Sequence, residues 1–128
     1  MAYLDNTLIA HTPAPGSRQW HLLRDHTLAV AEMARRFAEP FGADTLAYRV
    51  GLLHDTGKSN PDFQAYLRRC DADPTFKGRG PDHKAAGATL AQRQLAPLAL
   101  LVQGHHGGLK SKEEFAAWLA ERQKDRVD

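Results

Sequence analysis

Residues 51–58 read GLLHDTGK and place a histidine, His54, directly before an aspartate, Asp55. Farther along the chain, residues 104–108 read GHHGG and contain a second adjacent pair, formed by two histidines. Imidazole and carboxylate groups are the ligands that hold borderline divalent metals such as Mn, Fe, Co, Ni and Zn. With two single histidines added, the sequence predicts a metal-binding set that comprises His26, His54, Asp55, His83, His105 and His106.

Helical periodicity extends along almost the whole chain, and no alternating pattern predicts a strand. The first helix is predicted over residues 21–39, where a proline and a glycine stop it. Its apolar face recurs at three- and four-residue steps and comprises Leu22, His26, Ala29, Val30, Met33 and Phe37. A second helix is expected from a cap at Asp44 to His54, with Gly57 at its C-terminal end.

The middle of the chain contains two further helix starts. Ser59, followed by Asp62, is expected to open a short third helix. Residues 70–81 hold two prolines and two glycines without an apolar period, which predicts a loop. After this loop, Asp82 is suited to cap a fourth helix that begins near His83.

The last third of the chain completes the predicted bundle. Pro97 suits the first turn of a fifth helix, which ends at the histidine pair before Gly107 and Gly108. Ser111 and Glu114 match a capping box at the start of a final helix. We therefore predict an all-α fold, a compact bundle of about five to six helices.

Length and composition fit a single domain over residues 1–128. A chain of this size, 42% hydrophobic, can bury about two-thirds of its unfolded surface in one core. The single cysteine, Cys70, and a start without a signal-peptide pattern favour the reducing cytoplasm. The longest apolar run, residues 95–102, is far shorter than the about 20 residues that span a bilayer, so no membrane partner is expected.

The charge is almost balanced, with 17 basic and 15 acidic side chains and a net charge of +2. A polyanionic partner is permitted, but its binding surface would need local clusters of basic residues. The candidates for such clusters are Arg68, Arg69, Lys77, Arg79, Lys84, Lys110 and Lys112.

The predicted ligand pairs fall at helix ends, and this placement has chemical consequences. Neighbours inside a helix point about 100° apart, whereas the backbone can turn after a helix ends and aim both side chains at one place. The two oxygens of Asp55 can then bridge two ions about 3.5 to 4 Å apart. A bridged pair of cations suits phosphodiester hydrolysis, because it activates water and stabilises charge on phosphoryl oxygens.

Four stretches of the sequence together resemble one known family. They are WHLLRDHTLAVAEMARRFAEPFG, GLLHDTGKSNPDFQAYL, DHKAAGA and GHHGGL, which lie in this order between residues 20 and 109. They resemble the HD nuclease domain of the CRISPR-associated helicase-nuclease of type I systems. The resemblance implies an all-helical HD fold, a two-metal centre and cleavage of single-stranded DNA beside a helicase and an RNA-guided surveillance complex. The chain itself contains no helicase motifs.

The resemblance also implies roles for individual residues. It assigns two divalent transition-metal ions, Mn, Fe, Co or Ni, to the site. One ion would be held by His26, His54 and Asp55. The other ion would be held by Asp55, His83, His105 and His106. Asp55 and Lys58 are the expected catalytic residues, since Lys58 matches a family lysine that lies near the phosphate.

This chain departs from the family pattern at two positions. The family has a late aspartate that completes the first ion's ligands, and neither Asp125 nor Asp128 is a convincing substitute. Lys84 follows the Asp82-His83 pair where the family commonly has a serine. His11 and His21 are not expected to bind metal, and His21 is interpreted as a helix-start residue or a substrate contact.

Two other functions remain open at this stage. An HD phosphohydrolase acting on a nucleotide or cyclic nucleotide would need a closed pocket with base and sugar contacts. A catalytically weak, partner-binding HD module would agree with the missing late aspartate. Metal-dependent digestion of single-stranded DNA, duplex DNA and nucleotides distinguishes the three.

Overall fold

The computed structural model describes residues 7–124 and confirms the predicted all-α fold class. Its helices are α1 (Leu23–Ala38), α2 (Asp44–Leu53), α3 (Pro61–Ala72), α4 (Lys84–Leu95), α5 (Ala99–Gly104) and α6 (Lys112–Lys124). Short 3-10 turns lie at η2 (Glu39–Phe41), η3 (Thr56–Ser59) and η4 (Ala96–Leu98). None of the described helices combines the length and apolar character that crossing a bilayer requires.

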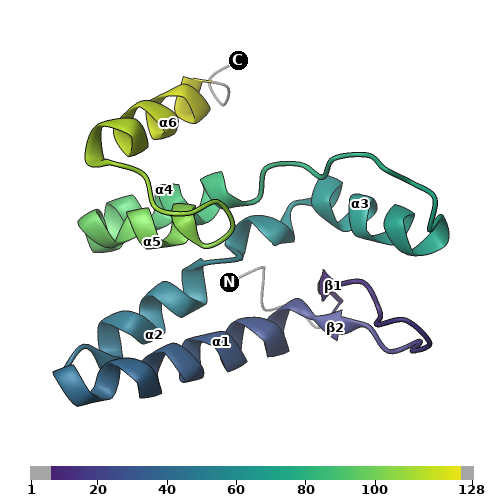
Figure 1. Ribbon diagram of the computed structural model, residues 1–128, viewed down its shortest axis with the longest axis horizontal. Helices are drawn as coiled ribbons and strands as arrows, with labels where there is room; N and C mark the ends of the chain where they lie inside the picture. The colour runs from purple at the N-terminus through teal and green to yellow at the C-terminus, as the bar shows by residue number, and fades with distance from the viewer. Residues whose placement is uncertain (1–6, 125–128) are drawn as a thin grey trace.

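The helices form stacked pairs. Figure 1 shows α1 and α2 side by side at one edge, α4 and α5 in the middle, and α6 on the opposite side of that second pair. The main core lies between α2 and the last three helices and contains Leu53, Ala88, Val102, Phe115 and Leu119. The chain between α2 and α3 therefore passes through the centre of the molecule, which is where the GLLHDTGK stretch lies.

The buried face of α1 differs from the predicted face by one residue. Leu23, Thr27 and Ala31 are buried, whereas the expected core residues Met33 and Phe37 are 51% and 75% exposed. The cause is the close approach of α1 to α2. A Cβ atom on Gly51 of α2 would lie only 2.5 Å from the Cα atom of Ala31, so small residues must form this contact and the large side chains point outward.

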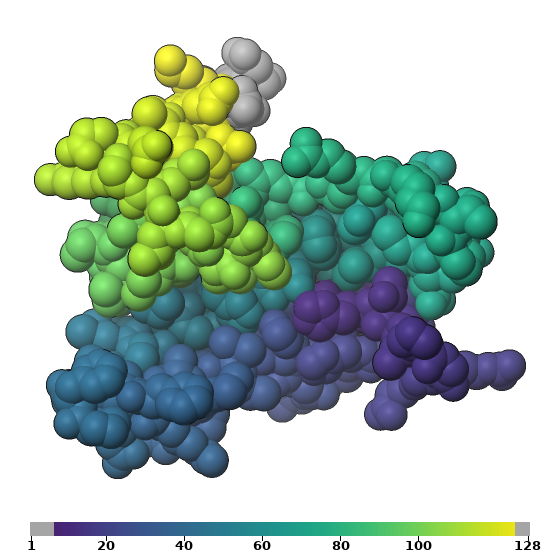
Figure 2. Space-filling view, in the orientation of Figure 1, coloured from purple at the N-terminus to yellow at the C-terminus, as the bar shows by residue number. Residues whose placement is uncertain are grey.

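The prediction that the chain has no strands is wrong. Strand β1 (Ile9–His11) pairs antiparallel with β2 (His21–Leu22), so His21 lies in a strand rather than at the start of the first helix. Strands of three and two residues are too short to show an alternating pattern. In Figure 2 the purple segment that carries β1 lies between α1 and α3.

Several predicted helix ends are confirmed at the level of side-chain hydrogen bonds. Oδ1 of Asp82 accepts from the backbone N–H groups of Lys84 and Ala85, at 2.8 and 3.3 Å. Ser111 and Glu114 form the predicted capping box, each side chain accepting from the other residue's backbone N–H. Both ends are encoded by residues close together in sequence.

Other helix ends need correction. Ala43 rather than Asp44 is the N-cap of α2, and Asp44 instead places its negative charge in the first turn. Asn60 rather than Ser59 caps α3, because the Ser59 hydroxyl donates to the Thr56 carbonyl. The predicted loop starts late, since α3 continues to Ala72.

Two special residues also differ from expectation. Gly57 does not end α2, which stops at Leu53, but lies in η3 against the backbone of His83. Pro97 lies in η4, and α5 begins only at Ala99. In both cases a 3-10 turn takes residues that the sequence pattern assigned to an α-helix.

Candidate metal centre

Asp55 lies at the centre of a ring of histidines and is only 1% exposed. Its Oδ2 atom lies 3.0 Å from Nε2 of His26 and 3.2 Å from Nε2 of His54. On its other side, Oδ1 lies 3.2 Å from Nε2 of His105 and 3.8 Å from Nε2 of His83. Each carboxylate oxygen therefore faces its own group of imidazoles.

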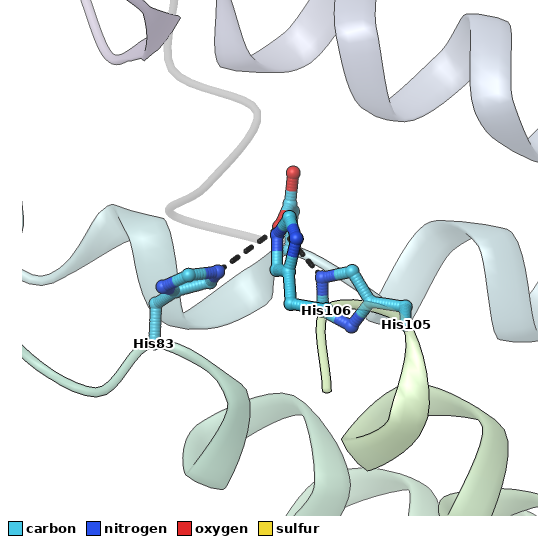
Figure 3. Close-up of side chains that lie close together, drawn as sticks. His83, His105 and His106 are labelled. Atoms are coloured by element: carbon cyan, nitrogen blue, oxygen red, sulfur yellow. Dashed lines mark hydrogen bonds and ion pairs between the residues drawn. The ribbon is translucent and has the colours of Figure 1, made fainter. Parts of the chain in front are cut away.

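The residues of this cluster come from four separate segments. His26 lies in α1, His54 follows α2, and His83 precedes α4, while the histidine pair follows α5. Figure 3 shows His83, His105 and His106 gathered at one place, with His83 reaching in from a different segment than the pair. The fold therefore brings together the six ligands that the sequence predicted, five of them beside helix ends and His26 within α1.

The ligand atoms form two groups that share Asp55. In one group they come from His26, His54 and Asp55, and in the other from Asp55, His83, His105 and His106. Within each group the atoms lie within 4.8 Å of one another, close enough to converge on a metal ion. His106 is the most open member, with Nε2 3.9 Å from Oδ1 of Asp55 and 48% of its side chain exposed.

Backbone carbonyls orient two of the imidazoles. Nδ1 of His54 donates to the carbonyl oxygen of Gly51 at 2.6 Å, and Nδ1 of His105 donates to that of Val102 at 2.6 Å. The Nε2 atom of each neutral ring is then left with a lone pair that faces a carboxylate oxygen. Two acceptors at this distance need a positive charge between them, a proton or a metal ion.

His83 also fits a metal site. Its Nε2 atom is buried and has no hydrogen-bond partner among the described residues. Burial, opposed by the nearby Asp55, lowers the pKa of His83 to about 4, so its imidazole is neutral at pH 7. A buried, neutral and unpartnered ring nitrogen that faces a carboxylate has the properties of a ligand for a borderline divalent metal.

Asp55 is ionised in this environment. Burial raises the pKa of its carboxyl, but in the metal-free site protons held between the carboxylate and His105, His26 and His54 form hydrogen bonds that outweigh that effect and hold the pKa well below its usual range. The site therefore supplies a negative charge at its centre, surrounded by imidazoles. This donor set fits divalent transition metals better than hard cations, which prefer oxygen ligands throughout.

Lys58 is buried in the same centre and is only 3% exposed. Its ammonium lies 2.9 Å from Oδ2 of Asp55 and donates to the carbonyl oxygen of Ala10 at 3.2 Å. The structure thus places this predicted catalytic residue against Asp55. Any role that it has in catalysis acts through the position and charge of that carboxylate.

Gln64 is a supporting residue that the sequence analysis did not single out. Its buried amide accepts from the backbone N–H of Ile9 at 3.0 Å and donates to the carbonyl oxygens of Ile9 and Lys58, at 2.9 and 2.7 Å. Gln64 therefore ties strand β1 to the segment that carries Asp55. The signal that could have identified Gln64 is the Phe63-Gln64 pair in the stretch GLLHDTGKSNPDFQAYL, which resembles the HD nuclease family.

A cleft of about 570 Å³ opens beside His83 and His106. Its wall carries two aromatic rings, Phe63 and Tyr66, and basic side chains that include Arg79 and Lys84. Neither Arg79 nor Lys84 forms an ion pair within the described residues. Two of the predicted basic candidates therefore border the cleft that leads to the metal-binding set.

Four further residues from the sequence analysis are His11, His21, Asp125 and Asp128. His11 and His21, which were not expected to bind metal, lie close to His26 in a third group of ring nitrogens. Asp125 and Asp128, the weak substitutes for the late family aspartate, lie outside the described residues.

Comparison with known protein families gives a match over most of the chain. The sequence profile described as "HD domain" matches residues 23–128, from the first residue of α1 onward. Comparison with curated proteins finds no match, and comparison with solved structures finds none either.

Proposed function

This chain belongs to the HD domain family, whose members are generally metal-dependent phosphohydrolases, and from that premise we propose that it hydrolyses phosphodiester bonds in single-stranded DNA. The observation that carries the proposal is the position of the cleft. Aromatic and basic side chains border this cleft, and so do His83 and His106, two members of the metal-binding set. We further propose that two divalent transition-metal ions, Mn, Fe, Co or Ni, act in this site.

The two oxygens of Asp55 support a two-ion arrangement, because each faces a separate group of imidazoles. When bound, such ions supply a water of lowered pKa and stabilise charge on the phosphoryl oxygens. Asp55 would hold both ions at a short separation. The carbonyls of Gly51 and Val102 would keep the rings of His54 and His105 directed at them.

Substrate binding is assigned to the cleft. Tyr66, which is half-buried, offers a ring surface for stacking of an unpaired base, and such stacking is independent of base sequence. Phe63 lies beneath it, buried against the ring of His83. Arg79 and Lys84 offer positive charge to the backbone phosphates. Lys84 stands where the resembling family commonly has a serine, so this chain would use a charge for that contact.

A role in CRISPR interference rests on the four resembling stretches. In that setting a helicase and an RNA-guided surveillance complex would supply the single strand to this domain. Because the scissile phosphate must reach the metal-binding residues through the cleft lined by His83 and His106, duplex DNA with its stacked bases is expected to be cut poorly.

A nucleotide phosphohydrolase is the rival activity, because the same rings and cations can hold a mononucleotide. The experiment is digestion of end-labelled single-stranded DNA, blunt duplex DNA and a panel of nucleotides and cyclic nucleotides, with Mn²⁺, Co²⁺, Ni²⁺ or Mg²⁺ added. We expect cleavage of the single strand only. An Asp55→Asn protein, checked for helical content, is expected to lose about 1,000-fold in rate, because it lacks the shared negative charge.

Each alternative outcome has a clear reading. Faster hydrolysis of a nucleotide than of the single strand would replace the nuclease proposal with the rival activity. No hydrolysis of any substrate by a folded, metal-loaded protein would favour the partner-binding module. Full activity of Asp55→Asn would overturn the proposed role of the carboxylate.

A further inference from the structure

A second cluster of imidazoles lies on the N-terminal hairpin. His11 of β1 is the partner of His21 of β2, and directly opposed residues on paired strands have neighbouring side chains. Both rings lie over His26 of α1. The ring centres of His11 and His21 are 4.8 and 5.2 Å from that of His26, and 5.5 Å from each other. One ring nitrogen from each of the three residues lies within 4.8 Å of the others.

The hairpin is fixed relative to the Asp55 centre. Gln64 binds both backbone groups of Ile9, and the Lys58 ammonium binds the carbonyl oxygen of Ala10. The two residues directly before His11 are therefore anchored to buried groups. His26 is held by α1 and by the 3.0 Å contact of its Nε2 atom with Oδ2 of Asp55. The arrangement of the three rings thus follows from anchored elements rather than from a loose terminus.

The rings of His11 and His21 are available to a ligand. Both residues are exposed, and within residues 7–124 neither ring makes a hydrogen bond. A hollow of about 360 Å³ borders them on the side of the hairpin connection and gives solvent access. Imidazoles that only packed against each other would not need to bring three ring nitrogens to one place.

We propose that His11, His21 and His26 form an outer site for a borderline divalent metal such as Zn²⁺, next to the Asp55 centre and sharing His26 with it. Three imidazole nitrogens with one open position are a common zinc environment, and Mg²⁺ binds poorly without oxygen ligands. A neutral imidazole has one free lone pair, so His26 serves one ion at a time. The outer site therefore competes with the His26–His54–Asp55 group.

The first test follows the rings directly in the full, untagged chain. Protein with ¹⁵N-labelled histidine is titrated with Zn²⁺ after chelation of metals, and the ring nitrogens are followed by NMR. The ring nitrogens of His11 and His21 are expected to shift on Zn²⁺ addition and to stay unchanged with Mg²⁺. Unchanged His11 and His21 resonances at Zn²⁺ concentrations that saturate the other histidines would overturn the proposal.

The second test isolates the outer site with variants. A protein that combines Asp55→Asn with His83→Ala and His105→Ala lacks the shared carboxylate and most donors of the larger inner group, and calorimetry should still detect one Zn²⁺ ion on this protein once circular dichroism shows that it is folded. Adding His11→Ala and His21→Ala should weaken that binding by more than about 100-fold, since even indirect partners of metal ligands contribute 10- to 100-fold. Adding Gln19→Ala instead, an exposed change on the same hairpin, should leave it unchanged. Equal Zn²⁺ binding by both variants would contradict the assignment.

Discussion

The ammonium nitrogen of Lys58 lies 2.9 Å from Oδ2 of Asp55, and the two side chains are 4% and 2% exposed. This is the same carboxylate oxygen that faces His26 and His54. Lys58 therefore neutralises the buried carboxylate at the position where the smaller ligand group would hold its ion. The charge of the inner site is set by this pair as well as by any bound metal.

Replacing Lys58 by methionine tests this relationship. Lys58→Met should lower the free energy of unfolding of the metal-free protein by about 3 kcal/mol, because it leaves a buried carboxylate without its cation. Added Mn²⁺ should then recover more stability in the variant than in the original protein. Urea denaturation in chelator and in Mn²⁺ measures both effects. An unchanged midpoint in chelator would show that the pair does not support the fold.

Gly57 allows η3 to approach the segment before α4. A Cβ atom at this position would overlap the backbone carbonyl of His83, which cannot rotate away. Gly57→Ala should therefore destabilise the protein by about 1 to 3 kcal/mol and displace His83 from Asp55. Thermal unfolding and metal titration check the two consequences.

Gly107→Ala is the matched control for that substitution. Nothing lies nearer to a Cβ atom there than the Lys84 ammonium, at 3.7 Å, and the backbone has no positive φ. The Gly107→Ala protein should therefore fold with a nearly unchanged free energy of unfolding. If both alanine variants behave alike, the contact with His83 is not what requires glycine at position 57.

The stability of the metal-free protein should fall between pH 6.5 and about pH 4. Burial lowers the pKa of His83 to about 4 from its ordinary value of 6.5, so in this window the unfolded chain binds a proton that the folded chain does not. The free energy of unfolding should decrease by about 2 kcal/mol from pH 7 to pH 5 for this residue. Denaturation in chelator at several pH values, with His83→Asn as the comparison, should show a flatter profile for the variant.

The features that the sequence predicted correctly depend on residues near one another along the chain. The capping box of Ser111 and Glu114 spans four positions, and the side chain of Asp82 caps residues two and three positions away. The pairs His54-Asp55 and His105-His106, which follow α2 and α5, are likewise local features of the sequence. Local chemistry of this kind is visible in a single sequence.

The features that it missed depend on tertiary contacts. The pairing of His11 with His21 needs a strand that is held by Gln64, which lies 55 residues away from Ile9. The face that α1 buries is set by the fit of Ala31 against Gly51 on another helix. Periodicity alone gave a face that was wrong by one residue, because it weighs hydrophobicity and not the space between helices.

The two inner groups should hold metal unequally. Asp55, His83, His105 and His106 provide four donors, whereas His26, His54 and Asp55 provide three. The smaller group also shares its carboxylate oxygen with the Lys58 ammonium, and His26 is shared with the outer histidines. Fewer donors and a competing cation both weaken binding, so we expect one Mn²⁺ ion to survive dialysis and the second to require millimolar free Mn²⁺.

Mn²⁺ is the suitable probe for this difference, because three neutral imidazoles without a carboxylate bind it weakly and the outer site should stay empty. Metal analysis after dialysis measures how many Mn²⁺ ions the protein retains. Titration of DNA cleavage with Mn²⁺ measures the concentration at which the second ion binds. The rate should follow the weaker ion, since the phosphodiester needs both. His106→Ala should remove the tightly held ion, and Lys58→Met should lower the Mn²⁺ concentration needed for the weaker one. Two ions retained in the dialysed protein would mean that the smaller group has a further anionic ligand.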